Sequence, residues 1–167
     1  VNAEPFEVEK SIRLNVANET LKAHEVKVVW QLRNAKGEVK REESTVLHVE
    51  PLSASWLDKT DLSEASLYSD YVSYRMYEEG ALISEGSVLF CPPKHFEFVE
   101  PELTVRTEGD EIIVSSKYFA KSIEIRNEND DLILTDNFFD LHGGEKRVKI
   151  LKGSAEGITV RSVYNIC

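Results

Sequence analysis

The sequence has few cysteines and no closely spaced set of metal-ligating side chains. Its 167 residues include only two cysteines, Cys91 and Cys167, and its four histidines stand far apart. Zinc sites and disulfide frameworks usually show their ligands or cysteines at short, regular spacings. We therefore expect both cysteines to be unpaired thiols, and we expect no bound metal and no cofactor.

Positive charge is also scarce in this chain. The 20 Lys and Arg residues are outnumbered by 30 Asp and Glu residues, which gives a net charge of −10. Proteins that bind nucleic acid gain affinity by neutralising phosphates with Lys and Arg, so we expect no nucleic-acid partner. A content of 41% hydrophobic and 30% charged residues is typical of globular proteins, and we expect no contact with a membrane.

The first residues, VNAEPFEVEKS, lack a basic region followed by an apolar core. We therefore expect no secretory signal in this stretch. The chain opens on Val rather than Met, which is expected of a processed protein or of a piece of a longer one. The cellular compartment is left open.

Motifs for nucleophilic catalysis and for phosphate binding are also missing. No serine stands in a Gly-x-Ser-x-Gly elbow, and no glycine cluster forms a phosphate-binding loop. The candidates for the carboxylate pair of a glycosidase are Asp130, Asp131, Asp136 and Asp140. All four stand in segments of turn composition, where Asp is favoured because its side chain bonds the local backbone. We interpret them as turn residues.

What the sequence does contain is alternation. From Ser11 to Ile166 apolar residues recur with a period of two, which predicts half-buried antiparallel strands. In the first half we expect two hairpins, and between them a short strand and a crossover loop within 53–67. The expected hairpin strands are 26–33 with 38–49, and 70–77 with 81–90. The Pro92-Pro93 pair then interrupts any sheet, because proline has no amide hydrogen to donate. We predict domains at 1–93 and 94–167.

The second half alternates in the same way. Expected strands are 103–105, 112–115, 122–126, 132–134, 147–150 and 158–164. A count of about seven short strands suits a small immunoglobulin-like sandwich. The predicted fold is therefore all-β, with two tandem immunoglobulin-like antiparallel β-sandwiches.

The least generic stretch is TDNFFDLHGGEKRVKI, residues 135–150. Its acidic and amide side chains can accept backbone amides at a corner, and two successive phenylalanines in an extended chain point to opposite faces. The Gly-Gly pair permits positive φ, so we expect it to turn the chain into the strand at 147–150. We interpret this stretch as a rigid corner without an activity. Its motif residues are Asp136, Asn137, Phe138, Phe139, Asp140, Leu141, Gly143 and Gly144.

These motif residues, together with other segments of the chain, resemble those of a known enzyme family. Phe119-Ala120, the run LILTDNFFDLHGGEKRVKI and the end of the chain at 161–165 resemble the C-terminal immunoglobulin-like domain of β-mannosidases in glycoside hydrolase family 2. The first half is similar to the sandwich that precedes it, from NVANETLKAHEVKVVWQLRNAKGEV through Glu50-Pro51-Leu52-Ser53 to Pro92-Pro93-Lys94. One departure is that Gly143-Gly144 stands where the family often has proline-glycine.

The resemblance implies a modular enzyme of which this chain holds only accessory domains. Such enzymes are retaining, exo-acting glycosidases whose two catalytic glutamates lie on a (β/α)-barrel upstream, one of them in an Asn-Glu dipeptide. The dipeptides Asn18-Glu19 and Asn127-Glu128 do not follow a barrel strand, so the catalytic role is not carried over to them. The implied partner is the barrel of the same protein. A sister β-glucosaminidase or β-galactosidase is the nearest alternative.

A second hypothesis is a stand-alone module that binds carbohydrate or protein through its surface. Trp56 and the exposed members of Tyr71, Tyr74 and Tyr77 would make the contacts. Aromatic residues are favoured on strands and fill sandwich cores, so packing is the alternative role for each of them. Side-chain direction decides between the two roles.

Overall fold

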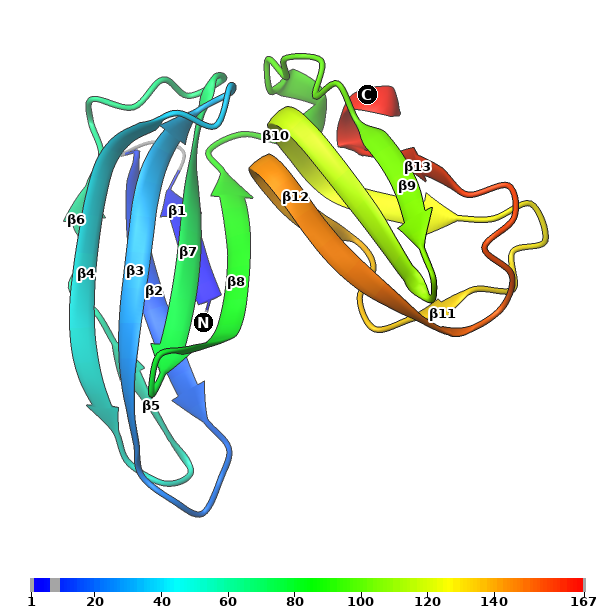
Figure 1. The fold of residues 1–167 in the computed structure, drawn as a ribbon. Coiled ribbons are helices and arrows are strands. Elements are labelled where there is room, and N and C mark those ends of the chain that lie inside the picture. Colours follow the sequence, from blue (N-terminus) through cyan, green and yellow to red (C-terminus); the bar gives the residue numbers. More distant parts are fainter. Residues whose placement is uncertain (1, 7–9, 167) are drawn as a thin grey trace. The chain divides into compact units, whose positions relative to one another are not determined.

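The structure, a computed structural model, describes residues 2–6 and 10–166. Within these ranges the chain forms β-strands and two 3-10 helices of three residues each, with no α-helix. Contacts divide it into two compact units, the first taking in residues 1–34 and 39–96 and the second residues 35–38 and 97–167 (Figure 1). The domain limits 1–93 and 94–167 stay a prediction. Neither helix is long and apolar enough to cross a membrane.

The first unit contains two antiparallel sheets. One has the order β1-β2-β5 with β6 also paired to β2, and the other has the order β4-β3-β7-β8. The strands of the first sheet are β1 (Asn2–Phe6), β2 (Ser11–Asn18), β5 (Ser53–Trp56) and β6 (Thr60–Asp61). Those of the second are β3 (His24–Asn34), β4 (Val39–Val49), β7 (Asp70–Glu78) and β8 (Ala81–Leu89). Both predicted hairpins are confirmed, since β3 pairs with β4 and β7 with β8.

The core of the first unit lies between its two sheets. Alternate residues of β3 are at most 5% exposed and point inward, namely Val26, Val28, Trp30 and Leu32. They pack with apolar residues of β2, namely Ile12, Leu14 and Val16. Burial of this inner face leaves the other residues of β3 on an outer face of the sheet, because side chains alternate along a strand.

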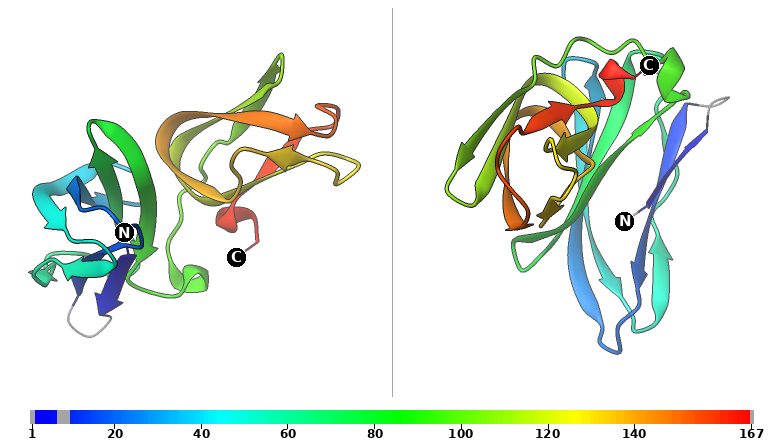
Figure 2. Two further views of the ribbon diagram at one scale, coloured as in Figure 1. Left: turned by 90° about the horizontal axis from the view of Figure 1, so that it is seen from below. Right: turned by 90° about the vertical axis from the view of Figure 1, so that its right-hand side faces the viewer.

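The second unit is built on two long strands. β10 (Glu111–Arg126) has 16 residues and β12 (Phe139–Lys152) has 14, and the two pair along most of their length. Three shorter strands flank them: β9 (Thr104–Glu108) and β13 (Thr159–Arg161) on β10, and β11 (Ile133–Leu134) on β12. Figures 1 and 2 show that both long strands curve. Together with the three short strands they form one sheet of five strands, in the order β11-β12-β10-β13 with β9 also on β10.

The immunoglobulin-like fold of the second half is confirmed, but four of its expected details are wrong. Within residues 97–166 there are five strands instead of about seven. The expected strands 112–115 and 122–126 are two parts of β10, and Gly143-Gly144 lies inside β12 where a turn was expected. The expected closing strand 158–164 is shorter, because β13 ends at Arg161 and a 3-10 helix, η2 (Val163–Asn165), follows it.

Candidate functional site

The signature stretch forms a corner that leads into β12, opposite an irregular part of β10. At two places along the pairing, two residues of β10 face one residue of β12. Lys117 and Tyr118 face Gly143, and Lys121 and Ser122 face Asp140. Such β-bulges bend a strand and increase its twist, which accounts for the curvature of β10. The motif thus lies along both bulges.

The carboxylate of Asp140 holds one of these bulges. Its Oδ1 accepts a hydrogen bond of 2.7 Å from the backbone N–H of Ser122, and its Oδ2 lies 3.4 Å from Nζ of Lys121. Ser122 has a positive φ of 50°, which a residue with a side chain seldom adopts. The carboxylate of Asp140 therefore stabilises a strained position in the opposite strand.

The other bulge, where Lys117 and Tyr118 face Gly143, depends on the conformation that glycine allows. Gly143 and Gly144 have φ values of 90° and 94°, a conformation in which residues with a Cβ are strained. A Cβ on Gly143 would also lie 3.2 Å from the carbonyl oxygen of Lys117, whereas a Cβ on Gly144 would meet nothing within 4 Å. The expectation that the pair turns the chain was wrong, but its reason, positive φ, is what the bulge requires.

The side chain of Asn137 completes the corner by making hydrogen bonds to β10 that a neighbouring strand would otherwise make. Its Nδ2 donates to the carbonyl of Ile125 at 3.1 Å, and its Oδ1 accepts from the N–H of Ile125 at 2.9 Å. The same Oδ1 also accepts from the N–H of Phe138 at 3.0 Å. Ile125 is only 2% exposed, and β12 begins only at Phe139, so the amide side chain satisfies backbone groups that would otherwise lack a partner there.

The remaining motif side chains divide between core and surface. Phe139 and Leu141 are each 7% exposed and belong to the core of the second unit. Phe138, with φ 62°, is 62% exposed, so the expectation that the two phenylalanines diverge is confirmed. Nζ of Lys146 lies 2.7 Å from Oδ2 of Asp136 and 4.7 Å from the centre of the Phe139 ring, which ties the start of the corner to β12.

The candidate carboxylates of a glycosidase are all engaged by local structure. Besides the contacts of Asp136 and Asp140, Asp131 accepts from Nδ2 of Asn127 at 2.6 Å. Asp130 accepts two hydrogen bonds from the guanidinium of Arg126, which holds the pKa of Asp130 below its ordinary value. A general acid needs the opposite shift.

In both Asn-Glu dipeptides, the side-chain amide of the asparagine makes hydrogen bonds within the protein. Nδ2 of Asn18, which is 7% exposed, donates to the carbonyls of Lys22, Val49 and Glu50, and its Oδ1 accepts from the N–H of Thr20. Asn127, 5% exposed, bonds Asp131 and the carbonyl of Ser154. These contacts give both asparagines a structural role, and no catalytic role is needed to explain them.

Neither cysteine nor histidine adds a site. Among the residues that the structure describes, no group of three or more His, Cys, Asp and Glu side chains is arranged to hold a metal ion. Cys91 is buried and Cys167 lies outside the described ranges, so its expected lack of pairing stays a prediction.

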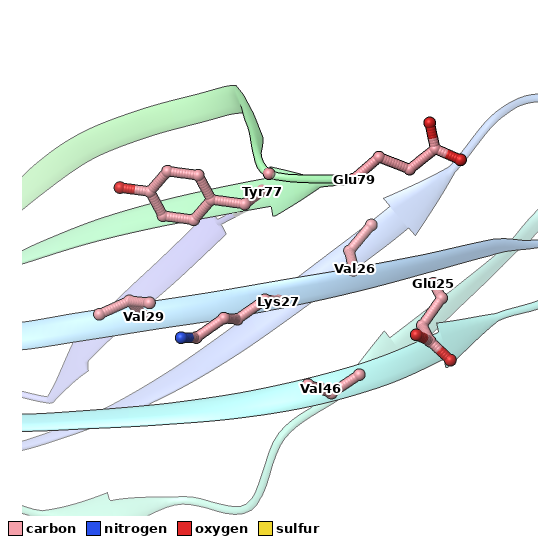
Figure 3. A pocket seen from close by; sticks show the side chains of 8 residues that line it. Glu25, Val26, Lys27, Val29, Val46, Tyr77 and Glu79 are labelled. Carbon is pink, nitrogen blue, oxygen red and sulfur yellow. The ribbon is translucent and has the colours of Figure 1, made fainter.

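The structure separates the four aromatic residues proposed as binding contacts. Tyr71 is fully buried, and Tyr74 packs against the core of the first unit. Trp56 is 45% exposed, with the guanidinium of Arg13 at 4.8 Å from the centre of its ring. Tyr77 lies half-buried on the outer face of the sheet that contains β3, in the hollow of Figure 3. Sequence reasoning missed its polar neighbours, because alternation alone does not show which face is hollowed.

Comparison with known proteins identifies both units. Residues 10–95 match the family model of the Mannosidase Ig/CBM-like domain, and residues 98–166 match that of an Ig-fold domain of mannosidases. No curated protein sequence matches the chain significantly.

Similar solved structures include two glycosidases. The chain aligns over 96% of its length with the β-D-mannosidase of Dictyoglomus thermophilum, at 15% identity and a TM-score of 0.74. With the exo-chitosanase CsxA of Amycolatopsis orientalis it aligns over 96% at 13% identity and a TM-score of 0.61. It spans only 21% and 26% of those two chains, and at these identities the likeness shows the fold. The chain belongs to the Mannosidase Ig/CBM-like domain family, whose model matches residues 10–95, and an Ig-fold domain of the kind found in mannosidases follows it at residues 98–166.

Proposed function

We propose that this chain is the non-catalytic, C-terminal two-domain region of a retaining, exo-acting β-mannosidase-like hydrolase. The whole enzyme would remove terminal β-linked mannose with two glutamates on a (β/α)-barrel in another part of the protein. The observation that carries the proposal is the order of the two domains, over 10–95 and 98–166, together with the small share of a β-D-mannosidase that the chain covers.

The carboxylates of the second unit support a non-catalytic role. A retaining glycosidase needs two carboxyl groups about 5–5.5 Å apart across a sugar, one of which must be protonated to act as the acid. Here the arginine beside Asp130 favours its ionised form, and Asp140 is bonded to a backbone N–H at 2.7 Å. These groups stabilise turns and a bulge of the second unit.

The corner offers a contact for the rest of the enzyme. Phe138 is largely exposed, and its backbone N–H is bonded to the side chain of Asn137, which is itself bonded to Ile125. An aromatic ring held in a fixed direction at the surface loses little entropy when a neighbouring domain covers it. We assign Phe138 to the intramolecular interface with the barrel or with another domain of the same enzyme.

The sugar specificity of the whole enzyme is set elsewhere. The same two-domain region aligns with a β-D-mannosidase and with an exo-chitosanase, two enzymes that are named for different sugars. A sister exo-glycosidase, acting on β-glucosaminides or β-galactosides, is therefore the alternative. Assays of the full-length protein on the three aryl glycosides distinguish these substrates.

We expect the isolated 167-residue chain to be inactive on an aryl β-mannoside, because it supplies no suitable pair of carboxylates. The measurement is aryl-alcohol release by chain purified from a host that lacks β-mannosidase, beside the full-length protein as the positive control. Turnover by the isolated chain would contradict the non-catalytic assignment. If the coding sequence upstream of Val1 holds no barrel with two glutamates, the parent enzyme is wrongly assigned.

A further inference from the structure

The outer face of the sheet β4-β3-β7-β8 carries two adjoining hollows. The larger, of about 420 Å³, is lined mainly by Glu25, Lys27, Val46 and Tyr77, and the smaller, of about 180 Å³, by Gln31, Glu42, Ser73 and Arg75. Val29 and Tyr77 line both of them. We call the two hollows together the outer groove.

The strand register explains how the groove is built. Lys27 of β3 pairs with Val46 of β4 on one side and with Tyr77 of β7 on the other, so the three form a row across the sheet (Figure 3). Four residues further along β3, Gln31 pairs with Glu42 and Ser73 in the same way. One end of the groove thus combines Tyr77 and Val46 with the charged Glu25 and Lys27, and polar groups line the other end.

Hydrogen bonds hold the polar end in place. Nε2 of Gln31 donates to Glu42, and its Oε1 accepts from a guanidinium nitrogen of Arg33. Nε of Arg33 also donates to Oγ of Ser73 at 3.0 Å, and on the next pair of strands Nε of Arg75 lies 3.3 Å from Oε2 of Glu85. These planar groups are therefore preorganised, and the guanidinium of Arg75 has a carboxylate beside it.

This arrangement suits a neutral saccharide. A sugar ring has an apolar C–H face, which an aromatic ring such as Tyr77 can cover, and a rim of hydroxyls, which act as both donors and acceptors. Amide, carboxylate, hydroxyl and guanidinium groups supply the complementary donors and acceptors. Because positive and negative groups alternate along the groove, the site favours a neutral ligand over an anion.

Trp56, the other exposed candidate, lies in a different setting. It is on β5, in the opposite sheet, and the guanidinium of Arg13 lies over its ring at 4.8 Å. A sugar that stacked on this face of the ring would have to displace Arg13. Tyr77 is therefore the better anchor of the two, and Trp56 provides a matched aromatic control.

We propose that the outer groove is a binding site for a neutral oligosaccharide, with Tyr77 as the stacking residue and Gln31, Glu42 and Arg75 as the hydroxyl partners. The site belongs to the first unit alone and does not depend on the parent enzyme proposed above. In an exo-glycosidase it would bind a polymeric substrate away from the reacting end.

The test is a titration of the 167-residue chain with β-1,4-linked mannotetraose. Binding is measured by the amide chemical shifts of the protein and by calorimetry. We expect weak, saturable binding with shifts confined to β3, β4 and β7. Tyr77→Ala should weaken binding about tenfold, the loss expected of a central aromatic anchor. Gln31→Ala should weaken it as well, Tyr77→Phe should weaken it less, and Trp56→Ala should leave it unchanged.

Circular dichroism and thermal unfolding of each variant show whether it is folded, so that loss of binding is not mistaken for loss of structure. The proposal is overturned if neither mannotetraose nor cellotetraose binds the wild-type chain. It is also overturned if Trp56→Ala abolishes binding while Tyr77→Ala does not. Tighter binding of an anionic tetragalacturonate that disappears at high salt would make the groove an anion site and contradict the neutral ligand.

Discussion

At the scale of single residues, the corner depends on side chains that make the hydrogen bonds which the backbone of a neighbouring strand would otherwise make. Asn137 bonds both the N–H and the carbonyl of Ile125, as the next residue of a strand would do. Asp140 satisfies the N–H of Ser122 across the bulge. Turn chemistry predicted that these side chains would bond backbone groups, but their partners lie 12 and 18 positions away in the sequence, so only the folded chain reveals them.

Asn137→Ala should destabilise the chain. Two backbone groups of the buried Ile125 would lose their partner, and a buried unsatisfied group costs about 1–3 kcal/mol. Urea unfolding followed by circular dichroism measures the change. Asn129→Ala, at an exposed position of the neighbouring turn, is the control and should change stability by less than about 0.5 kcal/mol. Equal effects of the two substitutions would refute the bridging role of Asn137.

At the scale of secondary-structure elements, the main feature is that two long strands, β10 and β12, stand where three short ones were expected, at 112–115, 122–126 and 147–150. The polar segment between the two apolar runs of β10 looks like a loop in the sequence, and Gly143-Gly144 looks like a turn. Both lie inside continuous strands instead, because β10 has one extra residue opposite Gly143 and another opposite Asp140, and the pairing continues past each place. The local composition indicates that the backbone at Gly143-Gly144 has positive φ, but it does not show whether the chain reverses direction at these residues.

The two glycines allow a graded test of this bulge. Gly144→Ala places a Cβ in open space at a φ of 94°, so only backbone strain opposes it, at about 1–3 kcal/mol. Gly143→Ala adds a close contact with the carbonyl of Lys117 and should cost on the order of 1 kcal/mol more. Chemical unfolding of the two variants beside the wild type gives the order. A larger loss for Gly144→Ala would show that the contact at Lys117 does not matter.

At the scale of the whole molecule, each unit has its own hydrophobic core. The core of the first unit includes residues of β2, β3 and β7, and that of the second is drawn from β10 and β12. The two family domains cover the same two parts of the chain. The predicted boundary after Pro93 falls before Phe96, whose ring makes an edge-on contact with Tyr71, with 6.3 Å between the ring centres.

This contact makes the boundary testable. A chain that ends at Phe96 should fold on its own, and it should be more stable than one that ends at Pro93, because Phe96 is 6% exposed and burial of such a side chain contributes about 1.5–3 kcal/mol. Thermal unfolding of the two shortened chains provides the comparison. Phe96→Ala in the longer chain should reproduce most of the difference. Equal melting temperatures would support the boundary at residue 93.

Sequence by itself determined the fold class, the hairpins and the resemblance to the immunoglobulin-like domains of mannosidases. Those conclusions follow from alternation, prolines and a distinctive motif, all of which act locally along the chain. Tertiary structure alone decided that Gly143-Gly144 sits in a strand, that Asn137 reaches Ile125, and that Tyr77 lies in a groove while Tyr71 is buried. Each of these depends on which strand lies beside which and in what register, and a register joins residues that are distant in the sequence.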